Sequence, residues 1–413
     1  MTADTGHPLH PDGAVTFSLF DGDWLHRIYA ILHISNRARF NILKRSLAVM
    51  TLTWVPVAVL ALASGHAGGG MVATNFFADF AAYAQFLVGM PLFMIAEPII
   101  DECTRSVARQ LISCDIVRPE DHGRLYHVHR LIARMRKPYW SDLVCITIAY
   151  VFSVIILIPE FRPNHLPTWH VQDYGQWRML TAPGVWEFLI ALPLMNYTWL
   201  RLMWKIVLWI FYLERVARMH LDLHPTHPDL TGGIGFISEA QGRFAIFILA
   251  YGISNVAATV GYEIAIQHYN FDVMPVWGPL FLFAVGAPLL FLTPLLMFTK
   301  HLYRSKTSAL AVYRERVTAQ GRSVESRWQT DDQGPQSTSD EIRELAELAT
   351  MSTMFLHIEK MRVVPFDLRS LGQLMGSSFG SVATVLPFLH FNGDIKNIFE
   401  VIGKLLSNLV GGH

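Results

Sequence analysis

The chain has 413 residues, of which 52% are apolar and only 16% are charged. This composition departs from that of a soluble chain of two or three domains and is typical of a polytopic membrane protein. The formal net charge is zero, which argues only weakly for or against a nucleic-acid partner; we expect none. Three cysteines lie in or beside one basic segment, which argues against a disulfide framework.

Basic residues are strongly segregated along the chain. Twenty-eight of the 33 Lys and Arg residues fall in four polar segments that alternate with apolar runs: 1–45, 101–140, 205–243 and 300–370. The positive-inside rule places such segments in the cytoplasm. We therefore expect an all-α, polytopic helical membrane protein with a cytoplasmic N-terminus, six or seven transmembrane helices, and additional cytoplasmic and amphipathic helices in contact with the lipid bilayer.

The predicted elements begin with residues 1–45, an N-terminal cytoplasmic or interfacial segment, in which Trp24 and Ile28 suggest a short helix at the membrane surface. Residues 46–299 are predicted to form a bundle of six spans, near 47–63, 80–100, 143–159, 185–213, 244–264 and 278–298. A helix from 185 to 219 would be about 50 Å long, well beyond a hydrocarbon core of about 30 Å. We expect its second half to project into the cytoplasm or to run along the interface.

Residues 300–370 form the largest predicted cytoplasmic segment, with a flexible linker at 329–337 and a helix after it. Residues 371–413 contain a final apolar run and an amphipathic C-terminal helix. The run 371–391 has 21 uncharged residues, which favours a seventh span over a re-entrant hairpin. Its Gly and Ser content suits close helix contact, and together with the amphipathic face of 394–410 it suggests a homo-oligomer.

Several ionisable residues interrupt the apolar runs. Glu97, Arg201, Lys205 and Glu263 lie within spans or at their edges, where an unpaired charge costs at least about 2.5–3.5 kcal/mol. We interpret them as candidates for lining a pathway, and the sharpest hypothesis is a Glu97–Arg201 pair that faces the bundle interior. Glu187 and Glu263 lie near predicted outer ends, where we expect carboxylates to reach the headgroups.

The densest polar group follows the fourth run. His220, His224, His227 and Asp229 lie within ten residues and are ligand types that Zn²⁺ or Mn²⁺ accepts, so a divalent metal is the one cofactor to consider. Their spacing matches no established zinc pattern. The alternative is a structural turn, in which Asp229 caps the next helix and glycines supply positive φ or close approach. The residues of this turn are Pro228, Asp229, Gly232, Gly233 and Gly235.

Two short motifs carry a resemblance. Residues 227–236 read HPDLTGGIGF, and residues 361–367 read MRVVPFD. Together they resemble a family of uncharacterised bacterial polytopic inner-membrane proteins, in which an HPDxxGGxGF-like turn precedes a span and an RxVPF-like turn follows a cytoplasmic helix. The resemblance covers most of the chain from the first span onward. It implies a bacterial inner-membrane location and a shared architecture, and it implies no activity.

The sequence leaves three hypotheses about the function. The chain has no Walker A loop and no HExxH helix. Residues 376–380 read GSSFG, but they lie in an apolar helical run and not in the strand-to-helix turn of a nucleophile elbow, so enzyme chemistry has no support. The first hypothesis is an oligomeric channel or transporter for an unidentified small solute or ion. The second is a non-transporting sensor or assembly scaffold that binds a cytoplasmic protein partner through 300–370. The third is a metal-dependent membrane enzyme that uses the His220–Asp229 loop.

Overall fold

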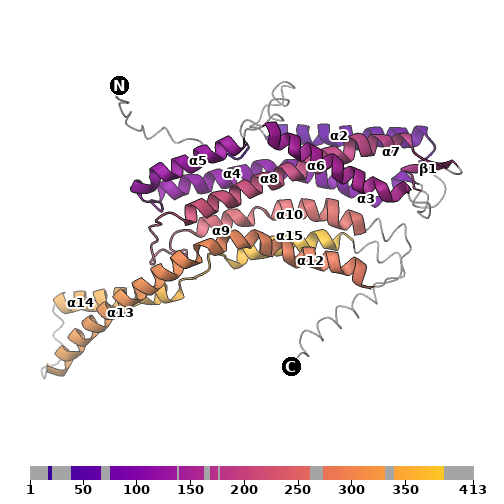
Figure 1. Cartoon of the computed structure of the whole chain (residues 1–413). Helices are drawn as coiled ribbons and strands as arrows, with labels where there is room; N and C mark the ends of the chain where they lie inside the picture. The colour runs from indigo at the N-terminus through magenta and orange to yellow at the C-terminus, as the bar shows by residue number, and fades with distance from the viewer. Residues whose placement is uncertain are drawn as a thin grey trace, which may run out of the picture.

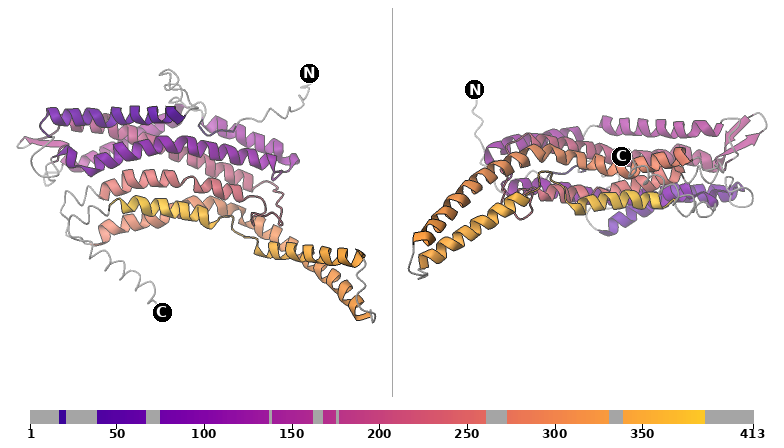
Figure 2. Two further views of the ribbon diagram at one scale, coloured as in Figure 1. Left: turned by 180° about the vertical axis from the view of Figure 1, so that it is seen from behind. Right: turned by 90° about the horizontal axis from the view of Figure 1, so that it is seen from below.

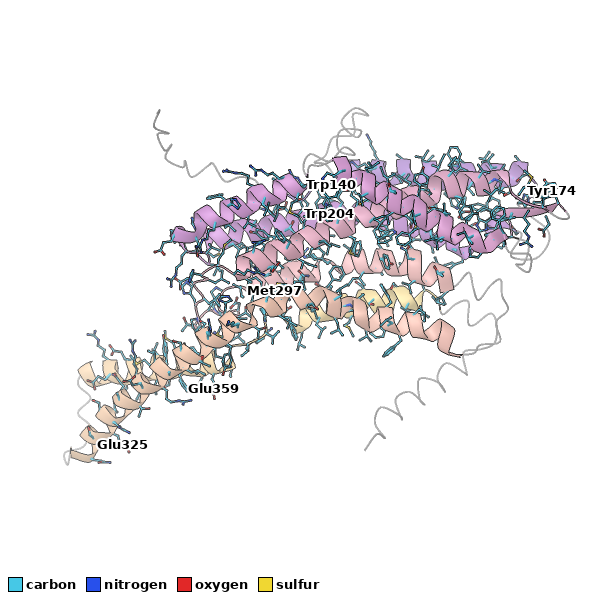
Figure 3. All side chains as sticks on the ribbon, in the orientation of Figure 1. Trp140, Tyr174, Trp204, Met297, Glu325 and Glu359 are labelled. Carbon is cyan, nitrogen blue, oxygen red and sulfur yellow. The ribbon has the colours of Figure 1, made fainter. Side chains whose placement is uncertain are left out.

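The computed structural model describes residues 17–20, 39–66, 75–136, 139–161, 168–174, 177–260, 273–330 and 339–385. In these residues the chain is mostly helical, and helices run side by side along one long axis (Figure 1). A short antiparallel ribbon, β1 (Val171–Tyr174) paired with β2 (Trp177–Leu180), lies at one end. We call this end the β-ribbon end, and Tyr174 lies there (Figure 3). The opposite end carries α5 (His122–Arg136) and is called the α5 end.

Five described helical stretches are long and apolar enough to cross a membrane: Ile42–Ala63, Phe80–Ser113, Trp140–Phe161, Gly235–Val260 and Gly278–Ser326. They correspond to the first, second, third, fifth and sixth runs predicted from the sequence. The fourth and the last predicted runs are not among them. The fourth is a long helix but carries Glu187, Arg201 and Lys205, and the last is represented by a helix of only 16 residues.

The elements of the first half are bounded as follows: α2 (Arg39–Ala63), η2 (Phe76–Ala78), α3 (Phe80–Ala82), η3 (Tyr83–Gly89), α4 (Met90–Ser113), η4 (Pro119–Asp121), α5, α6 (Tyr139–Leu157) and η5 (Ile158–Phe161). After the ribbon come α7 (Ala182–Trp186), η6 (Glu187–Ala191), α8 (Leu192–Ala217), α9 (Gly235–Gly242), α10 (Ala245–Tyr251), η7 (Gly252–Ala257), α12 (Val273–Leu292), η8 (Thr293–Phe298), α13 (Thr299–Thr330), α14 (Ser339–Lys360) and α15 (Leu368–Ala383).

Polar side chains mark the starts of several helices. The Asp79 carboxylate accepts a hydrogen bond from the Ala81 amide at 2.8 Å, and Thr181 accepts one from the Gly184 amide at 3.1 Å. Asp367 accepts from the Ser370 amide at 3.0 Å. Each satisfies an amide that lacks a partner in the first helical turn. The chain therefore begins α3, α7 and α15 at residues that its sequence specifies locally.

The long helix that contains Arg201 is continuous through α7, η6 and α8. Its second half is expected to project into the cytoplasm or to run along the interface. In the structure, Trp209, Tyr212 and Leu213 of this half are fully buried, and α8 packs against both α4 and α5. The amphipathic helix α5 covers this part of α8, which explains how a helix longer than a bilayer keeps its apolar side chains out of water.

Two apolar clusters hold the bundle together. The larger one lies toward the α5 end and joins α4, α5, α8, α9 and α10 through side chains such as Trp209 and Phe244. The smaller one lies toward the β-ribbon end and is built around Phe76, Phe86 and Trp169. In contrast, α6 leaves Leu143, Val151 and Ile155 largely exposed. An exposed face of this kind suits contact with lipid.

A long helical hairpin leaves the bundle at the α5 end. Helices α13 and α14 pack against each other and extend away from the other helices (Figures 1 and 2). Glu325 lies toward the far tip of the hairpin, and Glu359 lies nearer the bundle (Figure 3). The predicted cytoplasmic segment 300–370 is thus mainly this hairpin. Residues 331–337 of the predicted linker lie outside the described residues, as do the predicted interfacial helix around Trp24 and Ile28 and the predicted amphipathic helix 394–410.

Helix α15 makes the close contacts expected of the final run through its serines rather than its glycines. Ser370, Ser378 and Ser381 are buried against α9, α10 and α12. A Cβ on Gly252 of η7 would lie only 2.0 Å from the Ser381 hydroxyl oxygen. A Cβ added at Gly372, Gly376 or Gly380 of α15 would meet no atom of another part of the structure within 4 Å, so these glycines form an open stripe on the opposite face. The described part of this run ends at residue 385.

Candidate functional site

The predicted pair of intramembrane charges is present. The Arg201 guanidinium lies 2.5 Å from a Glu97 carboxylate oxygen, and the two side chains are 2% and 8% exposed. Lys205 is also buried, and its ammonium group lies 5.9 Å from the centre of the Phe20 ring. The structure therefore brings Glu97, Arg201 and Lys205 into the middle of α4 and α8. Glu263, the fourth candidate, lies outside the described residues.

The HPD turn is organised around one carboxylate. Asp229 accepts hydrogen bonds from the backbone amides of Thr231 at 2.8 Å, Gly233 at 3.1 Å and Gly235 at 2.9 Å. Burial alone would raise the pKa of Asp229, but these hydrogen bonds lower it below its usual range. The N-cap position of α9 belongs to Ile234 and not to Asp229 as expected, but Asp229 still accepts a hydrogen bond from the amide of Gly235, the first residue of that helix.

The glycines of this turn have the two uses that were expected. Gly232 and Gly233 have φ values of +66° and +94°, in the region that side chains with a Cβ rarely adopt. Gly235 is not in that region, but a Cβ there would lie 3.0 Å from an Asp229 oxygen. Pro228 lies between His227 and Asp229, whose side chains approach to 2.9 Å.

The four candidate metal ligands are divided between two places. His220 faces Asp121, with 3.3 Å between the imidazole and the carboxylate. His227 faces Asp229, and the backbone amide of His224 donates to the carbonyl of Gly232 at 3.0 Å. Among the described residues, no three His, Cys, Asp or Glu side chains are grouped so as to hold a metal ion. A metal here remains a prediction, and it would need Asp229 to share an oxygen that the turn already uses.

The two motifs that carry the family resemblance interlock, although they lie 130 residues apart in the chain. The Arg362 amide donates to the Leu230 carbonyl at 2.7 Å, and the His357 ring lies 2.9 Å from the His227 carbonyl oxygen. The Ser370 hydroxyl donates to the Ser238 carbonyl at 2.9 Å. The base of the α13–α14 hairpin is thereby fixed to the turn between α8 and α9.

A different polar group, which the sequence analysis did not identify, lies at the β-ribbon end. Three consecutive loop residues each bind a carboxylate from a different element. Thr168 donates to Glu160 at 2.7 Å, Trp169 donates to Asp79 at 2.9 Å, and His170 lies 2.9 Å from Glu187. We call Asp79, Glu160, His170 and Glu187 the outer cluster.

Three of the four residues of the outer cluster are buried. Glu160, His170 and Glu187 are between 4% and 6% exposed, so Glu187 does not reach toward headgroups as the sequence had suggested. Burial alone would lower the pKa of His170, but the Glu187 carboxylate, helped by Glu160 and Asp79, raises it to about 9. The raised pKa favours the imidazolium form of His170, which contacts the Glu187 carboxylate directly and is also stabilised by the charges of Glu160 and Asp79.

Local packing explains why the loop folds back onto the bundle. The Thr181 hydroxyl donates to the Trp169 carbonyl at 2.7 Å, and the Thr181 amide donates to the His170 carbonyl at 2.9 Å. A Cβ on Gly184 would lie 2.3 Å from that same carbonyl oxygen. Only glycine allows the first turn of α7 to approach the loop so closely. Thr181 and Gly184 thus hold His170 above Glu187.

A cavity of about 250 Å³ opens beside the outer cluster. Its lining includes Gln85, Glu187 and Phe188, and it extends to Ala258 and Thr259 just beyond η7. These residues lie on or next to η3, η6 and η7, which are all π-helical. Short π-helical turns are rare and frequently occur at functional sites, because they disturb the regular ladder of backbone hydrogen bonds. Three of them converge on one cavity.

The outer cluster and its cavity are the strongest candidate site in the described residues. Three carboxyl groups for one imidazole favour a ligand that is positively charged or donates hydrogen bonds. A sequence signal existed, because Asp79, Glu160, His170 and Glu187 all lie near predicted outer ends. Nothing in the sequence showed that the loop returns to cover them. Comparisons of the chain with models of protein families, with curated proteins and with solved structures found no match.

Proposed function

We propose that the chain is a multi-pass membrane transporter that takes a small cation or protonated amine into the cavity at the β-ribbon end. The observation that carries the proposal is the outer cluster, in which three consecutive residues, the buried His170 among them, each hold one carboxyl group beside a cavity of about 250 Å³. At about 30 Å³ per water molecule, this cavity has room for an alkali ion with waters or for a short alkylammonium ion.

The orientation follows from charge segregation. The α5 end and the hairpin carry most of the Lys and Arg residues, so we place that end and the N-terminus in the cytoplasm. The cavity then opens toward the outside. The helix formed by α7, η6 and α8 adds a sixth span, and the run that begins with α15 adds a seventh. By resemblance of the two interlocked motifs, we place the protein in a bacterial inner membrane.

The buried Glu97–Arg201 pair supplies the barrier below the cavity. Arg201 follows Glu187 by 14 positions on one continuous helix, which corresponds to about 21 Å along the axis. A cation bound at the outer cluster is thus separated from the cytoplasmic side by a closed, oppositely charged pair. Transport would require that pair to separate or to exchange partners, as ionisable groups within membrane helices do in known pumps and transporters.

The test uses the full chain in liposomes. We expect uptake of radiolabelled methylammonium or rubidium above that of protein-free vesicles, and we expect Glu187→Gln to remove it. Glu102→Gln is the matched control, because Glu102 lies on α4 at the opposite end and its side chain is 73% exposed. Wild-type uptake equal to that of empty vesicles for every cation tried would exclude the proposal.

A sensor or scaffold is the second candidate, and the hairpin favours it. Helix α14 exposes Ile342 and Leu345 in its first half, away from the bundle, where apolar side chains suit a protein partner. Vesicles that show no flux, together with a reproducible cytoplasmic partner lost on Ile342→Ser and Leu345→Ser, would favour this function. The exposed glycine stripe of α15 supports the further proposal of a homo-oligomer, which the molecular mass in detergent would test.

A further inference from the structure

A short segment near the N-terminus is inserted into the α5 end of the bundle. Phe17, Leu19 and Phe20 are 7%, 0% and 2% exposed, although they belong to no helix or strand. Four residues without secondary structure thus contribute three side chains to the larger apolar cluster.

The surface that receives this segment is polar as well as apolar. Asp101 of α4 accepts hydrogen bonds from the Ser18 hydroxyl at 2.9 Å and from the Leu19 amide at 3.2 Å. Arg136, the last residue of α5, donates to the Ser18 carbonyl. The backbone of Ser18 and Leu19 is therefore recognised from two helices, in addition to the burial of the side chains.

The aromatic contacts place the segment next to the buried cations of α8, on the side toward the α5 end. The Phe17 ring lies 5.0 Å from the ring of His129 and 4.7 Å from that of Tyr212. Burial lowers the pKa of His129 to about 4, so His129 packs as a neutral ring. The Phe20 ring lies 5.9 Å from the Lys205 ammonium, one turn along α8 from Arg201.

We propose that Phe17–Phe20 is a releasable plug that closes the α5 end of the bundle beneath Lys205 and thereby blocks the cytoplasmic exit of the cavity route. The plug makes few contacts within itself, and the burial of three apolar side chains is offset by the loss of freedom in four backbone residues. The seated and released states can therefore be close in free energy. The blocking role rests on the proposed transport function, whereas the seating and release of the segment do not.

The first test measures release without any transport. A membrane-impermeant amine reagent is added to the α5 end in inside-out vesicles, and modification of Lys205 is followed by mass spectrometry. We expect Lys205 to react slowly in the wild-type chain and at least tenfold faster in the Phe17→Ser/Phe20→Ser double variant. Lys300, which is exposed in the same molecule, is the internal standard. Phe161→Ser, at the β-ribbon end, is the matched control and should leave the Lys205 rate unchanged.

Two further arms keep the test decisive if the double variant folds poorly. Asp101→Ala removes the acceptor of the Ser18 and Leu19 hydrogen bonds while leaving the apolar residues in place, and we expect a smaller rise in Lys205 reactivity. A synthetic peptide of residues 14–22 added to the double variant should restore protection, and the same peptide with both phenylalanines replaced by serine should not. Equal Lys205 rates in all folded variants would overturn the plug.

Uptake measurements separate the two proposals. If the plug blocks the route, the double variant should take up cations several-fold faster than the wild type. Faster Lys205 labelling with no cation uptake in any variant would retain a releasable segment and reject transport. Wild-type uptake that is unchanged by plug variants in which Lys205 is accessible would retain transport and reject the blocking role.

Discussion

The HPD turn and the outer cluster both bury carboxylates, but they satisfy them in different ways. In the turn, Asp229 accepts hydrogen bonds from three backbone amides, and these amides do not titrate. In the outer cluster, Glu187 faces His170, a side chain that gains or loses a proton. A carboxylate held by the backbone is fixed and organises a fold, whereas one held by an imidazole can be altered by pH or by a ligand.

The two regions should also respond to pH in opposite directions. The pKa of Asp229 lies below its usual value of 3.8, so its contribution to stability is present above that pH and is lost on acidification. The pKa of His170 is raised from 6.5 to about 9, so its contribution is complete below pH 6.5 and is lost as the pH rises through 9. The contrast between structural and adjustable sites can therefore be tested with single substitutions.

The largest effect is expected at a third carboxylate, Glu97, whose partner has a permanent charge. Glu97→Gln would leave the buried Arg201 guanidinium without this carboxylate, at a cost of about 3–5 kcal/mol. We expect a large fall in the melting temperature of the protein in detergent. The exposed pair Glu102 and Arg109 provides the control, because its loss should cost under about 1 kcal/mol. A Glu97→Arg/Arg201→Glu exchange should recover part of the loss, and failure to recover either single variant would count against a simple ion pair.

The next effect is expected in the turn. Asp229→Ala would leave three amides without their acceptor, which we expect to destabilise the protein by about 3 kcal/mol. The α13–α14 hairpin should also become more sensitive to protease, because its base is attached to this turn. Asp222→Ala is the control, because Asp222 lies seven residues before Asp229 and its side chain is half exposed. Equal melting temperatures for the two variants would mean that Asp229 does not organise the turn.

An effect of similar or smaller size is expected from pH. Between pH 6.5 and 9.5 the wild-type protein should lose up to about 3 kcal/mol of stability as His170 deprotonates. The His170→Gln variant should be less stable at pH 6.5 and nearly independent of pH over this interval. Melting curves across the range provide the measurement. Parallel curves for the two proteins would show that His170 is not the titrating group.

The smallest effect is expected from backbone strain. Gly233→Ala places a Cβ on a residue with φ of +94°, 3.2 Å from the Ile116 side chain, and should cost about 1–2 kcal/mol. Gly123→Ala, on α5 with no atom within 4 Å, should be neutral or slightly stabilising because alanine favours helix. If Gly233→Ala were as stable as Gly123→Ala, the turn would tolerate another backbone conformation.

Some residues of the candidate sites could be predicted from the sequence, and others could not. Glu97 and Arg201 could be paired because each lies in an apolar run at a similar depth and neither charge is stable alone. The Asp229 turn could be recognised because its glycines and its carboxylate are neighbours in the chain. His170 could not, because a histidine in a polar loop looks the same whether it is exposed or folded back onto a helix.

The sequence by itself determined that the chain forms apolar helices separated by basic segments, since both depend on local composition. It also determined the starts of α3, α7 and α15 and the turn at Asp229, since capping and positive φ act over a few residues. Only the tertiary structure decided that Thr168, Trp169 and His170 cover three carboxylates, that the two motifs interlock, and that Phe17–Phe20 enters the α5 end. These contacts join residues far apart in the chain, and their free energy depends on which side chains the packed helices bring together.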